Sequence, residues 1–138
     1  MSDAKSPLTL DLDWKDGLRF VGRTGDVSMT LDGDSQAGPS PVQALAFALA
    51  GCMAIDVVHI LTRGRTEPRA LHAHLVGHRA ETDPKRFVRI VLHFTATGDV
   101  PADKVERAIA LSREKYCSVW HSLRPDLEFT TSFDVTKA

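Results

Sequence analysis

The chain has 138 residues, of which 43% are hydrophobic and 25% are charged, as in an ordinary soluble globular protein. This length suits one domain with one hydrophobic core. The formal net charge of −1 provides no basic surface of the kind that binds nucleic acid or anionic membranes, so we expect neither as a partner.

An antiparallel meander of three short strands is predicted over residues 7–31. Apolar residues alternate with polar ones over residues 8–14 and again over residues 27–31, which is the pattern of half-buried strands. Asp16-Gly17 is a hairpin signal between the first strand and the strand that follows it.

A nearly uninterrupted apolar run, residues 42–61, predicts a central helix over residues 41–63. Ser40 suits the N-cap, Pro41 the first helical position and Gly64 the C-cap. A helix that is apolar nearly all round must be buried on nearly all sides. Because a domain of this size has little room for such a helix, we expect a second copy of the chain to enclose part of it.

A transmembrane helix is the competing interpretation, since the run is about long enough to span a bilayer. Asp56 and His59 stand inside the run, however, and an ionisable pair near the bilayer centre is costly. The first residues, MSDAKSPLTLDLDW, lack the basic stretch followed by an apolar one that marks a secretory signal. We therefore expect a cytoplasmic protein with no membrane partner.

The second half of the chain predicts a hairpin over residues 69–97, a helical segment over residues 101–123 and a last strand over residues 126–136. Pro101 opens the helical segment, and Pro125 ends it. Together with the meander and the central helix, these elements predict a single α+β domain over the whole chain.

Four histidines fall largely on the polar face of the predicted hairpin: His72, His74, His78 and His93. A metal cluster is conceivable there, but no carboxylate or cysteine completes a ligand set nearby, so a solvated sheet face is the simpler interpretation. The sequence contains no HExxH motif, no phosphate-binding glycine loop and no GxSxG elbow. We expect neither a metal nor a cofactor.

Two cysteines, Cys52 and Cys117, stand 65 positions apart, which fits neither a zinc ribbon nor a CxxC motif. In a reducing compartment they are either inert packing residues or a transient redox pair. Cys52 shares the one polar face of the central helix with three residues at helical spacing: Asp56, His59 and Arg63. A buried ion pair or a dimer contact is one interpretation of Asp56 and His59, and a catalytic role is the other.

The chain resembles the OsmC/Ohr family, and most of all its YhfA-like branch, over nearly its whole length. Two motifs carry the resemblance, SPVQALAFALAGCMAIDVVHILTRGR around Cys52 and LSREKYCSV around Cys117, together with the order of strands and helices. The resemblance implies an OsmC-like fold, with antiparallel sheets around two long central helices in an intertwined homodimer.

The resemblance also implies an activity. Characterised members of the family are thiol-dependent peroxidases that reduce organic hydroperoxides. Cys52 matches the peroxidatic cysteine, which becomes a sulfenic acid, and Cys117 matches the resolving cysteine, which converts that acid to a disulfide. The implied partner is a dithiol reductant, either a lipoyl protein or a thioredoxin-like protein.

In the family, an arginine of the meander and a glutamate just after the first proline of the helix hold and activate the first cysteine. Arg23 is the better match for the arginine, and Arg19 is the second. Val42 and Gln43 stand where the glutamate would be, so Gln43 offers hydrogen bonding without charge.

An apolar pocket around Cys52 would suit a bulky organic hydroperoxide. The side chains expected to contact this substrate are Gln43, Phe47, Met53 and Trp120. The missing glutamate favours the alternative of a non-catalytic protein that binds a small hydrophobic ligand at the dimer cleft. Another thiol chemistry is a third option, and the reactivity of the Cys52 thiol distinguishes the classes.

Overall fold

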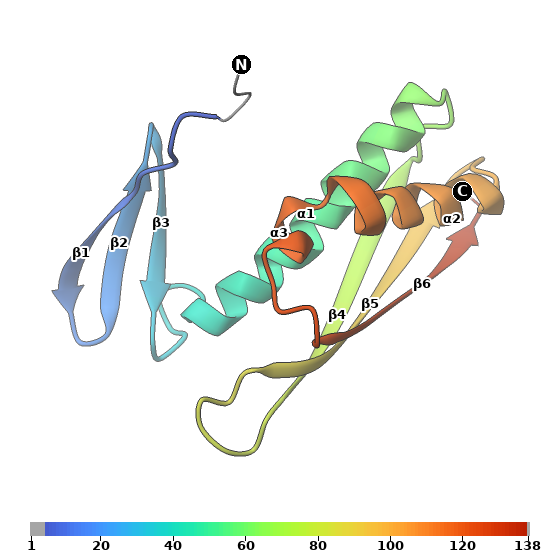
Figure 1. Ribbon diagram of the computed structural model, residues 1–138. Helices are drawn as coiled ribbons and strands as arrows, with labels where there is room; N and C mark the ends of the chain where they lie inside the picture. The colour runs from blue at the N-terminus through green and yellow to red at the C-terminus, as the bar shows by residue number, and fades with distance from the viewer. Residues whose placement is uncertain (1–4, 138) are drawn as a thin grey trace. The chain divides into compact units, whose positions relative to one another are not determined.

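The structure is a computed structural model that describes residues 5–137 (Figure 1). Its elements in chain order are β1 (Asp11–Asp16), β2 (Arg19–Thr24), β3 (Val27–Asp32), α1 (Pro41–Arg63), β4 (Ala70–Arg79), β5 (Phe87–Thr97), α2 (Ala102–Leu111), the π-helical turn η1 (Ser112–Tyr116), α3 (Ser118–His121) and β6 (Glu128–Thr136). The chain divides into two compact units, Met1–Leu45 and Ala46–Ala138, with the boundary inside α1.

The N-terminal unit is the predicted antiparallel meander, in the order β1-β2-β3. The ladder begins at the Asp11–Arg23 pair, three residues later than the alternation that starts at residue 8. Gly17 occupies the first turn with a φ of 50°, a conformation that glycine adopts without strain. One side of the meander leaves large apolar side chains exposed in the single chain: Leu8, Leu10, Leu12, Trp14, Leu18, Phe20, Val27 and Met29.

Asp32 organises the loop between β3 and α1. Its side chain is only 1% exposed and accepts the backbone N–H groups of Asp34, Gln36 and Ala37 at 2.9, 3.2 and 2.9 Å. The Arg19 Nε donates to the same carboxylate at 3.3 Å. The N–H of Ala37 and the other donors hold the pKa of Asp32 below its ordinary value.

A reciprocal capping box starts α1. The Gln43 N–H donates to Ser40 Oγ at 3.2 Å, and Gln43 Oε1 accepts the Ser40 N–H at 2.9 Å. The predicted N-cap is therefore confirmed. The sequence LTRGRT ends the helix with two backbone bonds, Arg65 N to Thr62 O at 3.0 Å and Thr66 N to Leu61 O at 2.9 Å.

The left-handed residue of this helix end is Arg65, with a φ of 61°, and not the glycine before it. Gly64 lies at the C-cap as predicted, but the position that most often requires glycine is one residue further along the chain.

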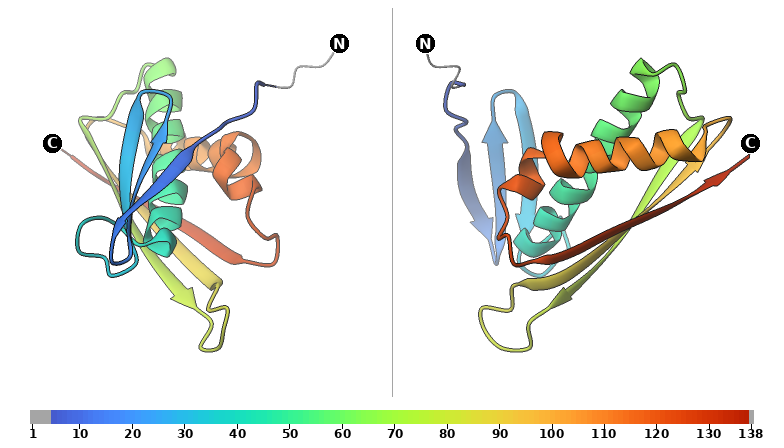
Figure 2. Two further views of the ribbon diagram at one scale, coloured as in Figure 1. Left: turned by 90° about the vertical axis from the view of Figure 1, so that its left-hand side faces the viewer. Right: turned by 45° about the vertical axis from the view of Figure 1, so that its right-hand side comes forward.

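The C-terminal unit is one three-stranded sheet, in the order β4-β5-β6, with α1 and α2 on one face (Figures 1 and 2). β4 and β5 form the predicted antiparallel hairpin. The expectation of antiparallel sheets throughout is wrong, because β6 runs parallel to β5. The helical segment between them carries the chain back along the sheet, so β6 starts at the same end as β5.

The hydrophobic core lies between this sheet and the two helices. It contains a row at four-residue spacing along α1, the inward side of β5, one side of α2 and residues near β6: Leu49, Met53, Val57, Leu61, Ile90, Leu92, Phe94, Ala96, Val100, Val105, Ala108, Ile109, Cys117, Leu127 and Phe129. At about 25 cal/mol per Å² of apolar surface, burial of these side chains is the main favourable contribution to folding of the unit.

The rest of α1 is not enclosed. Leu45, Phe47, Ile55 and Val58 are exposed in the single chain, so the helix is buried along one side and not on nearly all sides. By length and composition alone, α1 is long and apolar enough to cross a membrane, a test that core helices of soluble proteins also pass.

We expect Asp32→Ala to lower the Tm of the protein by several degrees, because three backbone donors and Arg19 lose their buried acceptor. Thermal unfolding followed by circular dichroism measures the shift. Asp34→Ala is the matched control, since no hydrogen bond of the Asp34 carboxylate is found within residues 5–137.

The effect of this substitution should also depend on pH. A carboxyl whose folded-state pKa is lowered stabilises the fold above its unfolded pKa of about 3.9, and this contribution is lost as the pH falls through the lowered value. The difference in Tm between the wild type and Asp32→Ala should therefore shrink below about pH 4. A difference that stays constant down to pH 2 would contradict this role.

Candidate active site: the Cys52–Cys117 pair

Cys52 lies in the middle of α1, on the helix face next to the core row. It is half-buried and packs against the hydrophobic core, between the fully buried Leu49 and Met53 in sequence. Asp56 lies one helical turn further along the same face and is also half-buried. His59 and Arg63, the other polar residues predicted on this face, are exposed.

Cys117 lies at the break between η1 and α3. Its side chain is 0% exposed. Its backbone N–H donates to Ser112 O at 2.8 Å, which closes the wide π-helical turn, and its sulfur caps α3 by accepting the Trp120 N–H at 3.4 Å. The sequence predicted only that the helix continues here or that a short new one begins. π-helical turns are rare and often occur at functional sites.

The structure brings Cys52 next to Cys117, close enough to raise the pKa of the Cys117 thiol, and both are free thiols. The pKa of the Cys117 thiol is raised to about 11, above all by burial and in smaller part by the adjacent Cys52 and the Asp56 charge. Cys117 is therefore a neutral thiol near pH 7. Two neighbouring thiols on segments far apart in sequence are candidates for a reversible disulfide.

Asp56 forms a hydrogen bond that the sequence analysis missed. Ser112, which is completely buried, donates its hydroxyl to Asp56 Oδ2 at 2.7 Å. The expected ion pair between Asp56 and His59 is not found among residues 5–137. The signal available in the sequence was the polar Ser112 within the apolar stripe of the second helix.

Aromatic stacking supports the segment that carries Cys117. The Trp120 and Phe129 ring centroids are 4.6 Å apart, and the Arg113 guanidinium carbon lies 5.6 Å from the Trp120 centroid and 4.9 Å from that of Phe129. His121 Nε2 lies 2.9 Å from Arg113 O. Trp120, predicted near the substrate, thus contacts Cys117 through its backbone and the core through its ring.

The four other predicted site residues lie in different surroundings. Met53 is 0% exposed in the core, whereas Phe47 is 71% exposed on α1. Gln43 Oε1 accepts hydrogen bonds from the Ser40 N–H and from the Ser35 hydroxyl, both at 2.9 Å, so it stabilises the start of the helix. Arg23 lies exposed on β2, in the N-terminal unit.

The two candidate arginines differ in their partners. Arg19 is held by Asp32, whereas Arg23 forms no ion pair within residues 5–137. Arg23 lines a groove of about 430 Å³ on the apolar side of the meander, together with side chains such as Leu10, Leu12 and Met29.

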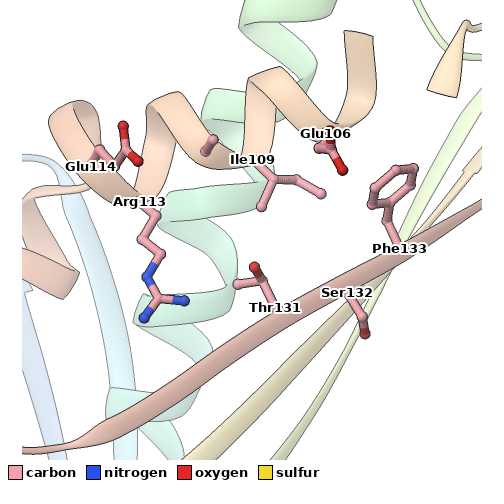
Figure 3. A pocket seen from close by; sticks show the side chains of 8 residues that line it. Glu106, Ile109, Arg113, Glu114, Thr131, Ser132 and Phe133 are labelled. Atoms are coloured by element: carbon pink, nitrogen blue, oxygen red, sulfur yellow. The ribbon is translucent and has the colours of Figure 1, made fainter. Parts of the chain in front are cut away.

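A second cavity, also of about 430 Å³, lies between the helical layer and β6 (Figure 3). It is lined by Glu106, Ile109, Ala110, Arg113, Glu114, Thr131, Ser132 and Phe133. Neither cysteine lines it, so this cavity does not by itself form a substrate pocket for the pair.

The histidines of the β4–β5 hairpin lie on its outer side. His74 pairs with His93 across the ladder, and His93 contacts Ser132 Oγ at 2.7 Å and Asp134 Oδ1 at 3.0 Å. In the part of the chain that the structure describes, no three His, Cys, Asp or Glu side chains are placed to hold a metal ion. Hydrogen bonding to Ser132 and Asp134 on the same face of the sheet therefore explains the presence of His93 at this position.

Fold and site together define an α+β protein whose helical layer places two free cysteines next to each other. Comparison with known families identifies the class further: the sequence model described as OsmC-like protein matches residues 32–132. The chain belongs to this family.

Individual relatives agree with the assignment. Protein YhfA of Escherichia coli K12 is 41% identical over 128 residues, which is 91% of this chain and 96% of YhfA. The crystal structure of a hypothetical protein from Aquifex aeolicus VF5 has a TM-score of 0.89 and 28% identity, over 97% of this chain and 99% of that one.

A more distant structure shares the fold alone. It is described as an organic hydroperoxide resistance protein OsmC from Legionella pneumophila and has a TM-score of 0.70 and 18% identity, over 96% of this chain and 99% of that one.

We expect Cys117 to be slow to alkylate at neutral pH, since its raised pKa leaves little thiolate. In Cys52→Ser, the rate of reaction with iodoacetamide should still rise beyond pH 9, because burial is the main cause of the shift and the substitution leaves burial unchanged. Mass spectrometry after timed alkylation measures the rate. A plateau below pH 9 would show that the thiol is not buried as described.

Proposed function

We propose that the protein is a thiol-dependent peroxidase that reduces organic hydroperoxides through Cys52 and Cys117. The observation that carries the proposal is the proximity of the two thiols, by which Cys52 raises the pKa of Cys117. Family membership supports it, as does the fold shared with a protein named for organic hydroperoxide resistance.

The surroundings of the two cysteines support different roles for them in the proposed reaction. Cys117 is fully buried and protonated near neutral pH, so it is a poor first nucleophile. Cys52 is half-buried and therefore retains surface through which a peroxide can approach. Cys52 is accordingly the peroxidatic residue, and Cys117 the resolving one.

The reaction balances in three steps. The Cys52 thiolate attacks the O–O bond of ROOH, forming Cys52–SOH and releasing RO⁻, which takes a proton to give the alcohol. The Cys117 sulfur then attacks the Cys52 sulfur, forming the disulfide, and the departing hydroxide leaves as water with the Cys117 proton. A dithiol, as in a lipoyl or thioredoxin-like protein, returns both cysteines to thiols and is itself oxidised to a disulfide.

Arg23 is the cation that we assign to the thiolate of Cys52. An arginine near a cysteine favours the ionised form, and the partner of Arg19 is already Asp32. We also propose that the protein acts as a homodimer in the cytoplasm. A second copy of the chain would cover the exposed apolar sides of the meander and of α1.

A specific observation favours the second candidate, a non-catalytic protein that binds a small hydrophobic ligand. Val42 and Gln43 stand where the family glutamate would be, and Gln43 Oε1 is engaged by the Ser40 N–H and the Ser35 hydroxyl. If Gln43 has only this capping role, Cys52 lacks a counterpart of the glutamate that activates the corresponding cysteine in the family.

The deciding experiment treats the reduced protein with cumene hydroperoxide and follows the thiols by mass spectrometry. We expect wild type to form a Cys52–Cys117 disulfide within seconds, Cys117→Ser to stop at the Cys52 sulfenic acid, and Cys52→Ser to stay reduced. Thiols that survive excess peroxide for many minutes would reject the peroxidase and favour ligand binding.

Arg23→Ala should slow the oxidation of Cys52 by cumene hydroperoxide about tenfold or more, in line with the loss of one charged group that stabilises the reacting anion. Arg23→Lys should recover part of the rate. Stopped-flow measurements of peroxide consumption give these rates. Arg107→Ala, at an exposed arginine of α2, is the matched control, and an equal loss in that variant would refute a specific role for Arg23.

A further inference from the structure

Ser112 connects the two cysteine segments through both of its oxygens. The hydroxyl donates to Asp56 Oδ2 at 2.7 Å, and the carbonyl accepts the Cys117 N–H at 2.8 Å. Asp56 in turn stands one helical turn after Cys52 on α1. A chain of two hydrogen bonds and one helical turn therefore links one cysteine to the other.

On each segment, one helical turn lies between the cysteine and the residue of the Ser112–Asp56 hydrogen bond. On α1, Asp56 lies about 6 Å along the helix axis from Cys52. On the facing segment, η1 is one π-helical turn that begins at Ser112, and the bond from the Cys117 N–H to Ser112 O closes it. Ser112 is bonded to Asp56, and Cys117, directly after the turn, adjoins Cys52.

The hydrogen bond of Ser112 attaches an unusual turn to α1. π-Helical turns are rare, and they occur frequently at functional sites. Ser112 and Asp32 are the buried polar residues among those that the structure describes, and Ser112 is separated from Asp56 by 56 positions in sequence. A buried hydroxyl that donates to a carboxylate forms one of the stronger hydrogen bonds in proteins.

We propose that Asp56 is a positioning residue for disulfide formation, which it supports by holding Ser112 and with it the turn that presents Cys117 to Cys52. This proposal rests on the proposed function. Asp56 takes no proton in the reaction, since the proton of the Cys117 thiol leaves with the oxygen of the Cys52 sulfenic acid as water.

Three substitutions separate the hydrogen bond from the charge. Ser112→Ala removes the donor and keeps the carboxylate, Asp56→Asn keeps an acceptor oxygen and removes the charge, and Asp56→Ala removes both. Ser112→Thr retains a hydroxyl and is the rescue variant. Ser118→Ala, beside Cys117 but outside the hydrogen-bond chain, is the matched control.

The first measurement does not need peroxide. Each variant is equilibrated with defined mixtures of reduced and oxidised glutathione, trapped by alkylation, and scored by mass spectrometry for the Cys52–Cys117 disulfide. We expect the equilibrium constant for disulfide formation to fall about tenfold in Ser112→Ala and Asp56→Ala, the size of one hydrogen bond to a charged group. It should stay within about twofold of wild type in Ser112→Thr and Ser118→Ala, whereas Asp56→Asn, which keeps a weaker neutral hydrogen bond, should lose less than Asp56→Ala.

The second measurement is a single turnover with cumene hydroperoxide. Ser112→Ala should form the Cys52 sulfenic acid at the wild-type rate but convert it to the disulfide more slowly. Failure of all variants and the wild type to react with peroxide would reject the proposed function, while the glutathione equilibrium would still test the positioning role.

The proposal is overturned if Ser112→Ala and Asp56→Ala keep the wild-type disulfide equilibrium. It is equally overturned if the equilibrium constant for disulfide formation falls as far in Asp56→Asn as in Asp56→Ala. In that case the charge of Asp56, and not its hydrogen bond to Ser112, would support the disulfide. Circular dichroism and Tm confirm that each variant folds. If Ser112→Ala does not fold, the contrast between Asp56→Asn and Asp56→Ala decides the question.

Discussion

The C-terminal unit depends on the burial of a single row of α1. Side chains at four-residue spacing, from Leu49 to Leu61, pack between β5 and α2, and this contact orients the whole helix against the sheet. Cys52 and Asp56 lie beside that row, so the packing that stabilises the unit also sets the direction in which both functional side chains point. The hydrophobic effect stabilises the packing of α1 against the sheet, and the periodicity of the helix places Cys52 and Asp56 on the same face.

Differences in burial give two chemically identical groups different behaviour. Cys117 lies within the core, where desolvation opposes its ionisation, whereas Cys52 is only partly covered. A nucleophile and a resolving thiol need this asymmetry, because the first must react with a substrate from outside and the second only with its neighbour. Ser112 makes the arrangement possible by bonding to the carboxylate of α1 and to the turn before Cys117.

Two apolar surfaces remain open in the single chain, the side of the meander that Leu12 and Met29 share and the side of α1 that carries Phe47 and Ile55. Exposed patches of this extent are typical of surfaces that bind another protein. Phe47 lies on the same helix as Cys52. In the proposed function, a second copy of the chain covers both surfaces.

Local signals in the sequence determined the elements of this protein. Alternation predicted the strands, the apolar run with Ser40 and Pro41 at its start predicted α1, and the motifs around Cys52 and Cys117 identified the family. The tertiary structure alone decided the parallel pairing of β6, the π-helical turn before Cys117 and the bond between Ser112 and Asp56. The physical reason is range: helix periodicity and capping act over three or four residues, whereas these features arise from contacts between residues tens of positions apart, which only packing of the core brings together.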